Sequence, residues 1–219
     1  MKRKLKKTLA FTLAEVLITL GIIGVVASTT IPVLMNNLQD NNFKTAYKKA
    51  YSILAQATQM IANDNGGTIS GIVTSNQTTK NIYMGYLSTI KNCDSGFSAG
   101  VCWATATKYF DGTVKTDMWN NNAGLVLKDG TSIIFGIVSA NCQSTGFGSP
   151  ASQSTCGTIS IDVNGLQGPN KFGKDMYMVH LLQNKVLPIG TQGDIFSSNP
   201  CPGTGWDSGL SCSAVYLHQ

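Results

Sequence analysis

The fold is decided by residues 11–31, which read FTLAEVLITLGIIGVVASTTI and form a long, mostly apolar run. Its one charged residue is Glu15, the only glutamate among the 219 residues, and no other charge lies between Thr8 and Gln39. A run of this length predicts a helix that spans a lipid bilayer. A carboxylate inside such a span costs about 2–4 kcal/mol relative to an apolar residue, so its presence indicates a function.

Five basic side chains precede the apolar run: Lys2, Arg3, Lys4, Lys6 and Lys7. They favour the cytoplasmic side of a membrane for this end of the chain. An ordinary secretory signal has a shorter apolar core, of about 7–15 residues, that ends at a small-residue cleavage site. A simple membrane anchor needs only about 20 apolar residues. Neither alternative explains Glu15.

Residues 1–35 resemble the N-terminus of a type IV prepilin or of a type II secretion pseudopilin. The shared signature is a basic leader, a small residue, Phe-Thr-Leu, a glutamate fifth after the cleaved bond, and a proline near the end of the apolar run. Ala10 stands where this family usually has glycine. The resemblance implies that a prepilin peptidase cuts between Ala10 and Phe11, and that the new amine of Phe11 is then methylated.

The resemblance also implies that Glu15 acts in subunit assembly. A helix places its carboxylate little more than one turn from the Phe11 amine, and a neighbouring subunit can bring its own amine closer. Breaking such a buried ion pair costs about 3–5 kcal/mol, because one charge is left alone. We therefore expect Glu15 to set the register between subunits. The alternative is a hydrated Glu15 near the lipid headgroups.

As implied by the resemblance, the protein is a structural subunit of a type IV pilus or a type II secretion pseudopilus, and is no enzyme. By the same resemblance, before assembly it is a single-pass protein of the inner or cytoplasmic membrane, with its C-terminal domain outside the cytoplasm. An assembly ATPase and a membrane platform protein then move it from the lipid into a periplasmic or cell-surface filament. Its partners there are itself and other pilins.

The net charge does not favour nucleic acid as a partner. The formal charge is +5, but the leader holds five of the sixteen basic residues, which leaves eleven against eleven acidic ones. Strong phosphate binding requires clustered Lys and Arg. The alternative function is that of a minor pilin, a surface binding module for adhesion or DNA uptake. The catalytic signatures of hydrolases, metalloproteases and nucleotide-binding enzymes are missing from the sequence.

Residues 11–64 are predicted to form one long helix, with 11–31 in the membrane or filament core and a break or bend near Pro32, which lacks a backbone donor. Residues 32–64 are amphipathic and present one face for burial. That face comprises Phe43, Ala46, Tyr47, Ala50, Leu54, Ala57, Met60 and Ile61. Asn65-Gly66-Gly67 ends the helix.

Residues 65–219 are predicted to form an exported β-rich domain. Apolar runs at 124–128 and 131–138 flank Asp129-Gly130, which indicates a hairpin, and further strands are expected at 158–163 and 176–182. The predicted fold class is α+β: a pilin-like helix packed on a roughly four-stranded antiparallel sheet. The segments 65–120 and 183–219 are expected to be loops stapled by disulfides.

Six cysteines lie on the exported side, where disulfides form. Six cysteines allow fifteen connectivities, and pairing between neighbours is the simplest. A zinc site is the alternative, but the chain has no Cys-x-x-Cys and only two histidines. The neighbour pairs are Cys93 with Cys102, Cys142 with Cys156, and Cys201 with Cys212.

A calcium site is a weaker candidate, and no other cofactor is expected. Asp162, Asn164 and Asp175 carry oxygen ligands of the kind that calcium binds, but their spacing differs from that of an EF-hand loop. The alternative is that these side chains cap the backbone of tight turns around Asn164-Gly165.

Overall fold

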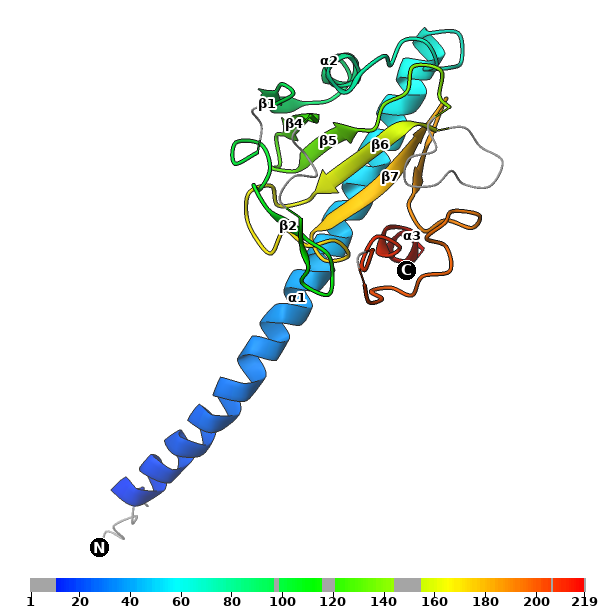
Figure 1. The fold of residues 1–219 in the computed structure, drawn as a ribbon. Helices are drawn as coiled ribbons and strands as arrows, with labels where there is room; N and C mark the ends of the chain where they lie inside the picture. Colours follow the sequence, from blue (N-terminus) through cyan, green and yellow to red (C-terminus); the bar gives the residue numbers. More distant parts are fainter. Residues whose placement is uncertain (1–10, 97–98, 116–120, 144–154, 206, 219) are drawn as a thin grey trace, which may run out of the picture. The chain divides into compact units, whose positions relative to one another are not determined.

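The protein has an α+β fold, in which a long N-terminal helix packs on an antiparallel sheet (Figure 1). The computed structural model describes residues 11–96, 99–115, 121–143, 155–205 and 207–218. The helices are α1 (Leu13–Asp64), α2 (Asn76–Met84) and α3 (Cys212–Leu217). The strands are β1 (Thr89–Cys93), β2 (Thr107–Lys108), β3 (Val114–Lys115), β4 (Ala123–Leu127), β5 (Ser132–Gly136), β6 (Thr155–Asp162), β7 (Met176–Leu182) and β8 (Val186–Pro188).

The chain divides into two compact units, Met1–Asn41 and Asn42–Gln219. Helix α1 contributes to both, because its 52 residues continue through Pro32 without interruption. Of the two alternatives for Pro32, the continuous helix excludes a break, and a bend there stays a prediction. The helix ends where the glycines were expected to end it: Gly66 has a φ of 75°, and the Gly67 N–H donates to the carbonyl of Ala62 at 2.7 Å.

The sheet belongs to the second unit and has six strands in the order β1-β4-β5-β6-β7-β8. Every neighbouring pair is antiparallel. The hairpin predicted at Asp129-Gly130 joins β4 to β5, and Gly130 has the positive φ, 91°, that such a turn needs. The strands predicted at 158–163 and 176–182 correspond to β6 and β7.

The prediction of four strands is wrong, because the sheet has an additional strand at each edge. Strand β1 is mostly exposed and has only one apolar residue, Ile90, before Cys93, so it lacks an apolar alternation. Strand β8 has three residues and ends at Pro188. Short, polar or proline-containing strands are the kind that tolerate a sheet edge. Strands of this kind lack the alternation of apolar and polar residues by which a strand is predicted from sequence.

The main core lies between residues 43–62 of α1 and one face of the sheet, and Figure 1 shows α1 running behind β6 and β7. The helix face is close to the predicted one, but Met60 is 54% exposed and Thr58 is buried in its place. Tyr47 is the central contact: its ring stacks on that of Tyr177 with a centroid separation of 4.0 Å, and its hydroxyl donates to the carbonyl of Ser213 at 2.9 Å.

Loops cover the opposite face of the sheet with a second apolar cluster. Trp103 is buried there, and a Cβ on Gly124 of β4 would stand only 2.6 Å from its ring. Glycine at this position therefore lets the indole approach the strand. Because both faces are covered, β5, β6 and β7 are buried along their whole length. This explains the mostly apolar sequences of β5 and β7.

The six cysteines form the three neighbour pairs, Cys93–Cys102, Cys142–Cys156 and Cys201–Cys212. Each closes a loop of 9 to 14 residues. Closing loops of this size stabilises a fold by about 3 kcal/mol, mainly by restricting the unfolded chain. The segments expected to be plain loops also contain α2, β1, β2, β3, β8 and α3.

A buried carboxylate organises the C-terminal loop. Asp194 accepts hydrogen bonds from the N–H groups of Gly190 and Phe196 at 3.0 and 3.1 Å, and its Oδ2 lies 2.8 Å from Nε2 of His180 on β7. Burial alone would raise the pKa of Asp194, but these hydrogen bonds outweigh it and lower the pKa. Asp194 thus fastens residues 189–196 to the sheet.

We predict that Tyr47→Ala lowers the free energy of unfolding by about 3–5 kcal/mol, since it removes a fully buried ring. Tyr47→Phe, which loses only the hydrogen bond to Ser213, should cost about 1–2 kcal/mol. Urea denaturation of the purified chain in detergent measures both changes. The control is Met60→Ala on the exposed side of the same helix, and an equal loss for that variant would contradict the assigned core.

Candidate functional site

The candidate site is the N-terminal end of α1. Ala10, the residue before the predicted cut, lies outside the described residues, and so does the basic leader. Phe11 is described, and its side chain is 86% exposed. Two residues separate the predicted cut from the first helical residue, Leu13. A new amine at Phe11 would therefore lie directly before the helix.

Glu15 takes part in a capping box with Thr12. Its Oε2 accepts hydrogen bonds from the Thr12 N–H and from the Thr12 hydroxyl, both at 2.8 Å, and its own N–H donates to Thr12 Oγ1 at 3.2 Å. This reciprocal pattern satisfies backbone donors that the first turn of a helix leaves open. The sequence prediction missed Thr12, although Thr followed by Glu three residues later, before an apolar run, is a known signal for a helix start.

The apolar residues of α1 between Leu13 and Leu38 are exposed around the helix. The helix is long and apolar enough to cross a membrane, with a mean hydropathy of 2.2 over its most apolar 18-residue window. Burying such a surface away from water is favourable by about 25 cal/mol per Å² of apolar area. This part of the chain therefore needs lipid or protein around it.

Near Pro32, side-chain hydroxyls of α1 form hydrogen bonds with backbone carbonyls of the same helix. The hydroxyls of Ser28, Thr29 and Thr30 donate to the carbonyls of Val25 and Val26 at 2.8–3.0 Å. In lipid, side-chain hydroxyls of this kind find a partner in the helix backbone, and they often bend the helix slightly. Polar residues at 28–30 are therefore compatible with an apolar surrounding.

The calcium candidates lie at the end of β6 (Asp162) and in the loop that joins β6 to β7 (Asn164 and Asp175). Asp175 is buried, and its two carboxylate oxygens accept the N–H groups of Asn170 and Lys171 at 2.8 and 2.7 Å. Asp162 is buried too, and it accepts the Asn164 N–H at 3.3 Å. These bonds agree with the alternative of side chains that cap turns. In the part of the chain that the structure describes, no three His, Cys, Asp or Glu side chains gather as a metal site requires.

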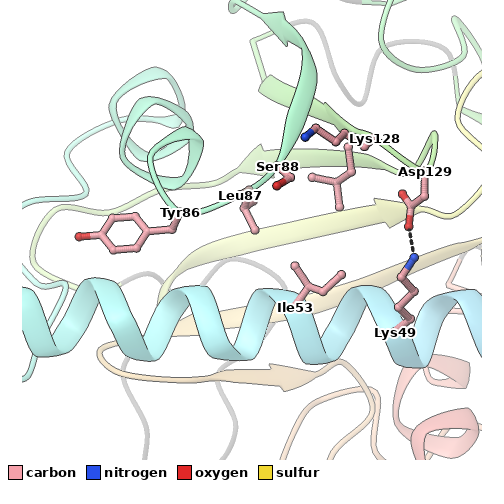
Figure 2. A pocket seen from close by; sticks show the side chains of 8 residues that line it. Lys49, Ile53, Tyr86, Leu87, Ser88, Lys128 and Asp129 are labelled. Carbon is pink, nitrogen blue, oxygen red and sulfur yellow. Dashed lines mark hydrogen bonds and ion pairs between the residues drawn. The ribbon is translucent and has the colours of Figure 1, made fainter.

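A groove in the second unit runs between α1 and the β4–β5 turn, and Figure 2 shows its lining. Its volume is about 310 Å³. Ile53, Leu87 and Leu127 make its apolar part. At one end Lys49 Nζ lies 2.8 Å from Asp129 Oδ2, which links the hairpin turn to the helix. Both side chains are partly exposed, so this ion pair contributes at most about 1 kcal/mol.

Comparisons of the chain with protein-family models, with curated proteins and with solved structures found no match.

We predict that Asp162→Asn stabilises the protein increasingly as the pH rises. Burial raises the pKa of Asp162 well above its ordinary value, and the charge of Asp175 adds to this effect. The native chain thus loses stability from about pH 3.9, the value of an unfolded Asp, upward through the raised pKa. Thermal unfolding between pH 4 and 8 should show that the variant is more stable than the unsubstituted chain only at the higher pH values.

If Asp162→Asn changed the stability equally at every pH, the effect would not come from the ionisation of Asp162, and the prediction would be wrong. Calcium added in the same assay tests the calcium candidate separately. A bound cation would stabilise the native chain at high pH and leave the Asn variant unchanged.

Proposed function

We propose that this protein is a filament subunit of the type IV pilin or type II secretion pseudopilin kind, with no catalysis of its own. The observation that carries the proposal is the long apolar helix, exposed around residues 13–38, that begins directly after the candidate cleavage site and carries a single acid, Glu15, in its first turn. Lipid covers this surface before assembly, and the same surface of other copies covers it afterwards.

In this proposal a prepilin peptidase removes residues 1–10, and the amine of Phe11 is methylated and stays positively charged. The leader charges leave with the first ten residues, so the remaining chain is formally neutral before its new terminus is counted. Residues 11–31 hold the processed chain in the inner or cytoplasmic membrane. An assembly ATPase and a platform protein then move it into the filament, with the disulfide-linked domain outside the cytoplasm.

Glu15 has two tasks that the structure allows us to separate. The first is the capping box with Thr12, which organises the first turn within one chain. The second is the proposed ion pair with the Phe11 amine of a neighbouring subunit, which requires a negative charge. Glutamine at N3 retains the capping hydrogen bonds but has no charge, so it preserves the first task and removes the second.

The first test is the mature N-terminus. Mass spectrometry of the native protein should show a chain that starts at methylated Phe11. A chain that keeps residues 1–10, or one that starts near residue 28 as after ordinary secretion, would contradict the proposal.

The second test compares Glu15→Gln with Thr12→Ala in cells that assemble the filament. We expect Glu15→Gln to be cleaved and inserted normally but to be lost from fibres, because an uncompensated ammonium costs about 3–5 kcal/mol. Thr12→Ala should lose about 1 kcal/mol of capping and still enter fibres. The measurement is the amount of each variant in sheared, sedimented fibres. Normal incorporation of Glu15→Gln would exclude the charge pair.

A further inference from the structure

The second unit contains a lysine that water does not reach. Lys80 lies on α2, and its side chain is 0% exposed. Lysine is almost never fully buried unless it is paired. Its amine must therefore be satisfied by neighbouring groups, because an ammonium without partners in the interior costs several kcal/mol.

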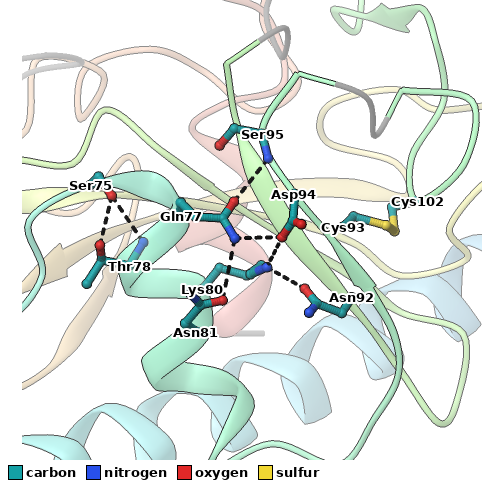
Figure 3. Close-up of polar contacts among 10 residues, drawn as sticks. All are labelled: Ser75, Gln77, Thr78, Lys80, Asn81, Asn92, Cys93, Asp94, Ser95 and Cys102. Carbon is teal, nitrogen blue, oxygen red and sulfur yellow. Dashed lines mark hydrogen bonds and ion pairs between the residues drawn. A yellow bond between two sulfur atoms is a disulfide. The ribbon is translucent and has the colours of Figure 1, made fainter.

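The amine reaches between two side chains at the edge of the sheet, as Figure 3 shows. Lys80 Nζ contacts the amide oxygen of Asn92 on β1, and it lies 2.5 Å from Oδ1 of Asp94, which directly follows the strand. Gln77, one turn earlier on α2, donates to the same Asp94 oxygen at 2.6 Å. The carboxylate is thus held from two positions of one helix.

The strand fixes the spacing of Asn92 and Asp94. Side chains two residues apart in a strand project to the same side, and the one between them projects to the other. Cys93 lies between them, is buried, and is joined to Cys102 by a disulfide. Gln77 also accepts the Ser95 N–H at 3.1 Å, which holds the chain after Asp94. An amine, an amide and a carboxylate are therefore kept together by both elements.

We propose that Lys80 and Asn92 become joined by an amide bond between their side chains after the domain folds. Asp94 takes a proton from the Lys80 ammonium, and the freed electron pair on Nζ attacks Cγ of Asn92. The Nζ–Cγ bond forms and the Cγ–Nδ2 bond breaks. Nδ2 receives the two protons that Nζ gives up, by way of Asp94, and leaves as ammonium. No oxidant, reductant or co-reactant is needed.

The three groups have the chemistry that these roles require. An uncharged lysine amine is a nucleophile, and a carboxylate within hydrogen-bond reach can accept the proton that the ammonium form releases. Hydrogen bonds from Lys80 and then from Gln77 lower the pKa of Asp94, so it is ionised at neutral pH. An ionised carboxylate resists attack by an amine, which leaves the neutral amide of Asn92 as the electrophile. Asp94 is 71% exposed, so the ammonium has a path to water.

The bond would fasten α2 to β1, the outermost strand of the sheet. Among the described residues, strand β1 pairs with β4 alone, and its residues Ile90, Lys91 and Asn92 are exposed. A covalent link would prevent this edge from separating from the domain. The inference depends on the folded second unit alone, and its failure would leave the proposed filament function untouched.

The test is mass spectrometry of the native, disulfide-bonded chain. After reduction, the intact protein should be lighter by one ammonia than the mass calculated for the same mature chain without the bond. Trypsin should not cut after Lys80, and the digest should contain a branched peptide of residues 50–91 joined to residues 92–108. Unmodified intact mass, together with separate peptides 50–80, 81–91 and 92–108, would overturn the proposal and leave Lys80 as an ion-paired lysine.

Two variants and a control locate the reaction. Lys80→Arg keeps the positive charge but cannot form this amide, so the branched peptide and the loss of ammonia should disappear completely. Asp94→Asn removes the base and should strongly reduce the branched fraction. Lys91→Arg is the matched control on β1: its side chain bonds the Val101 carbonyl, and the branched peptide should persist. Ammonia loss that remains in Lys80→Arg would come from another asparagine and would overturn the proposal.

Discussion

The structure depends on one constraint: the surface of α1 between residues 13 and 38 is mostly apolar and is exposed in the single chain. Burial of apolar area is the main favourable term both in folding and in association, so this surface favours lipid or other copies of the helix over water. The second half of the same helix is covered by the sheet within its own chain. One helix thus packs on the sheet with residues 43–62, whereas its apolar residues between 13 and 38 are exposed in the single chain.

The exposed apolar surface explains why the hydrogen bonds of Glu15 matter. The capping box with Thr12 satisfies polar groups in the first turn, which an apolar surrounding would otherwise leave without partners. It also holds the carboxylate near the start of the helix, where the positive end of the helix dipole favours a negative charge. The cap therefore does not compete with the proposed ion pair. It holds the carboxylate close to Phe11, where a second chain's amine is expected to arrive.

The sequence was sufficient to predict features that depend on local pattern. The long helix follows from its apolar run and its one-sided second half, and the β4–β5 hairpin follows from Asp129-Gly130. Features that depend on contacts distant in sequence were not predictable. Strand β1 has little apolar pattern and is placed at the sheet edge by its pairing with β4. His180 contacts Asp194 only in the folded C-terminal loop. The capping box also depends on a local pattern, Thr12 and then Glu15 before an apolar run, but the predictions for Glu15 comprise only an ion pair or a hydrated side chain.

In the proposed function, lipid and then other copies of this chain cover the apolar surface of α1. A photo-reactive residue placed at Val25 of the full-length protein in its native cells tests it most directly, because the label reacts with whatever touches the helix. The account predicts cross-linked dimers of this chain when filaments assemble, and cross-links to lipid when the assembly ATPase is absent. A label that reacts with water in both cases would contradict the account.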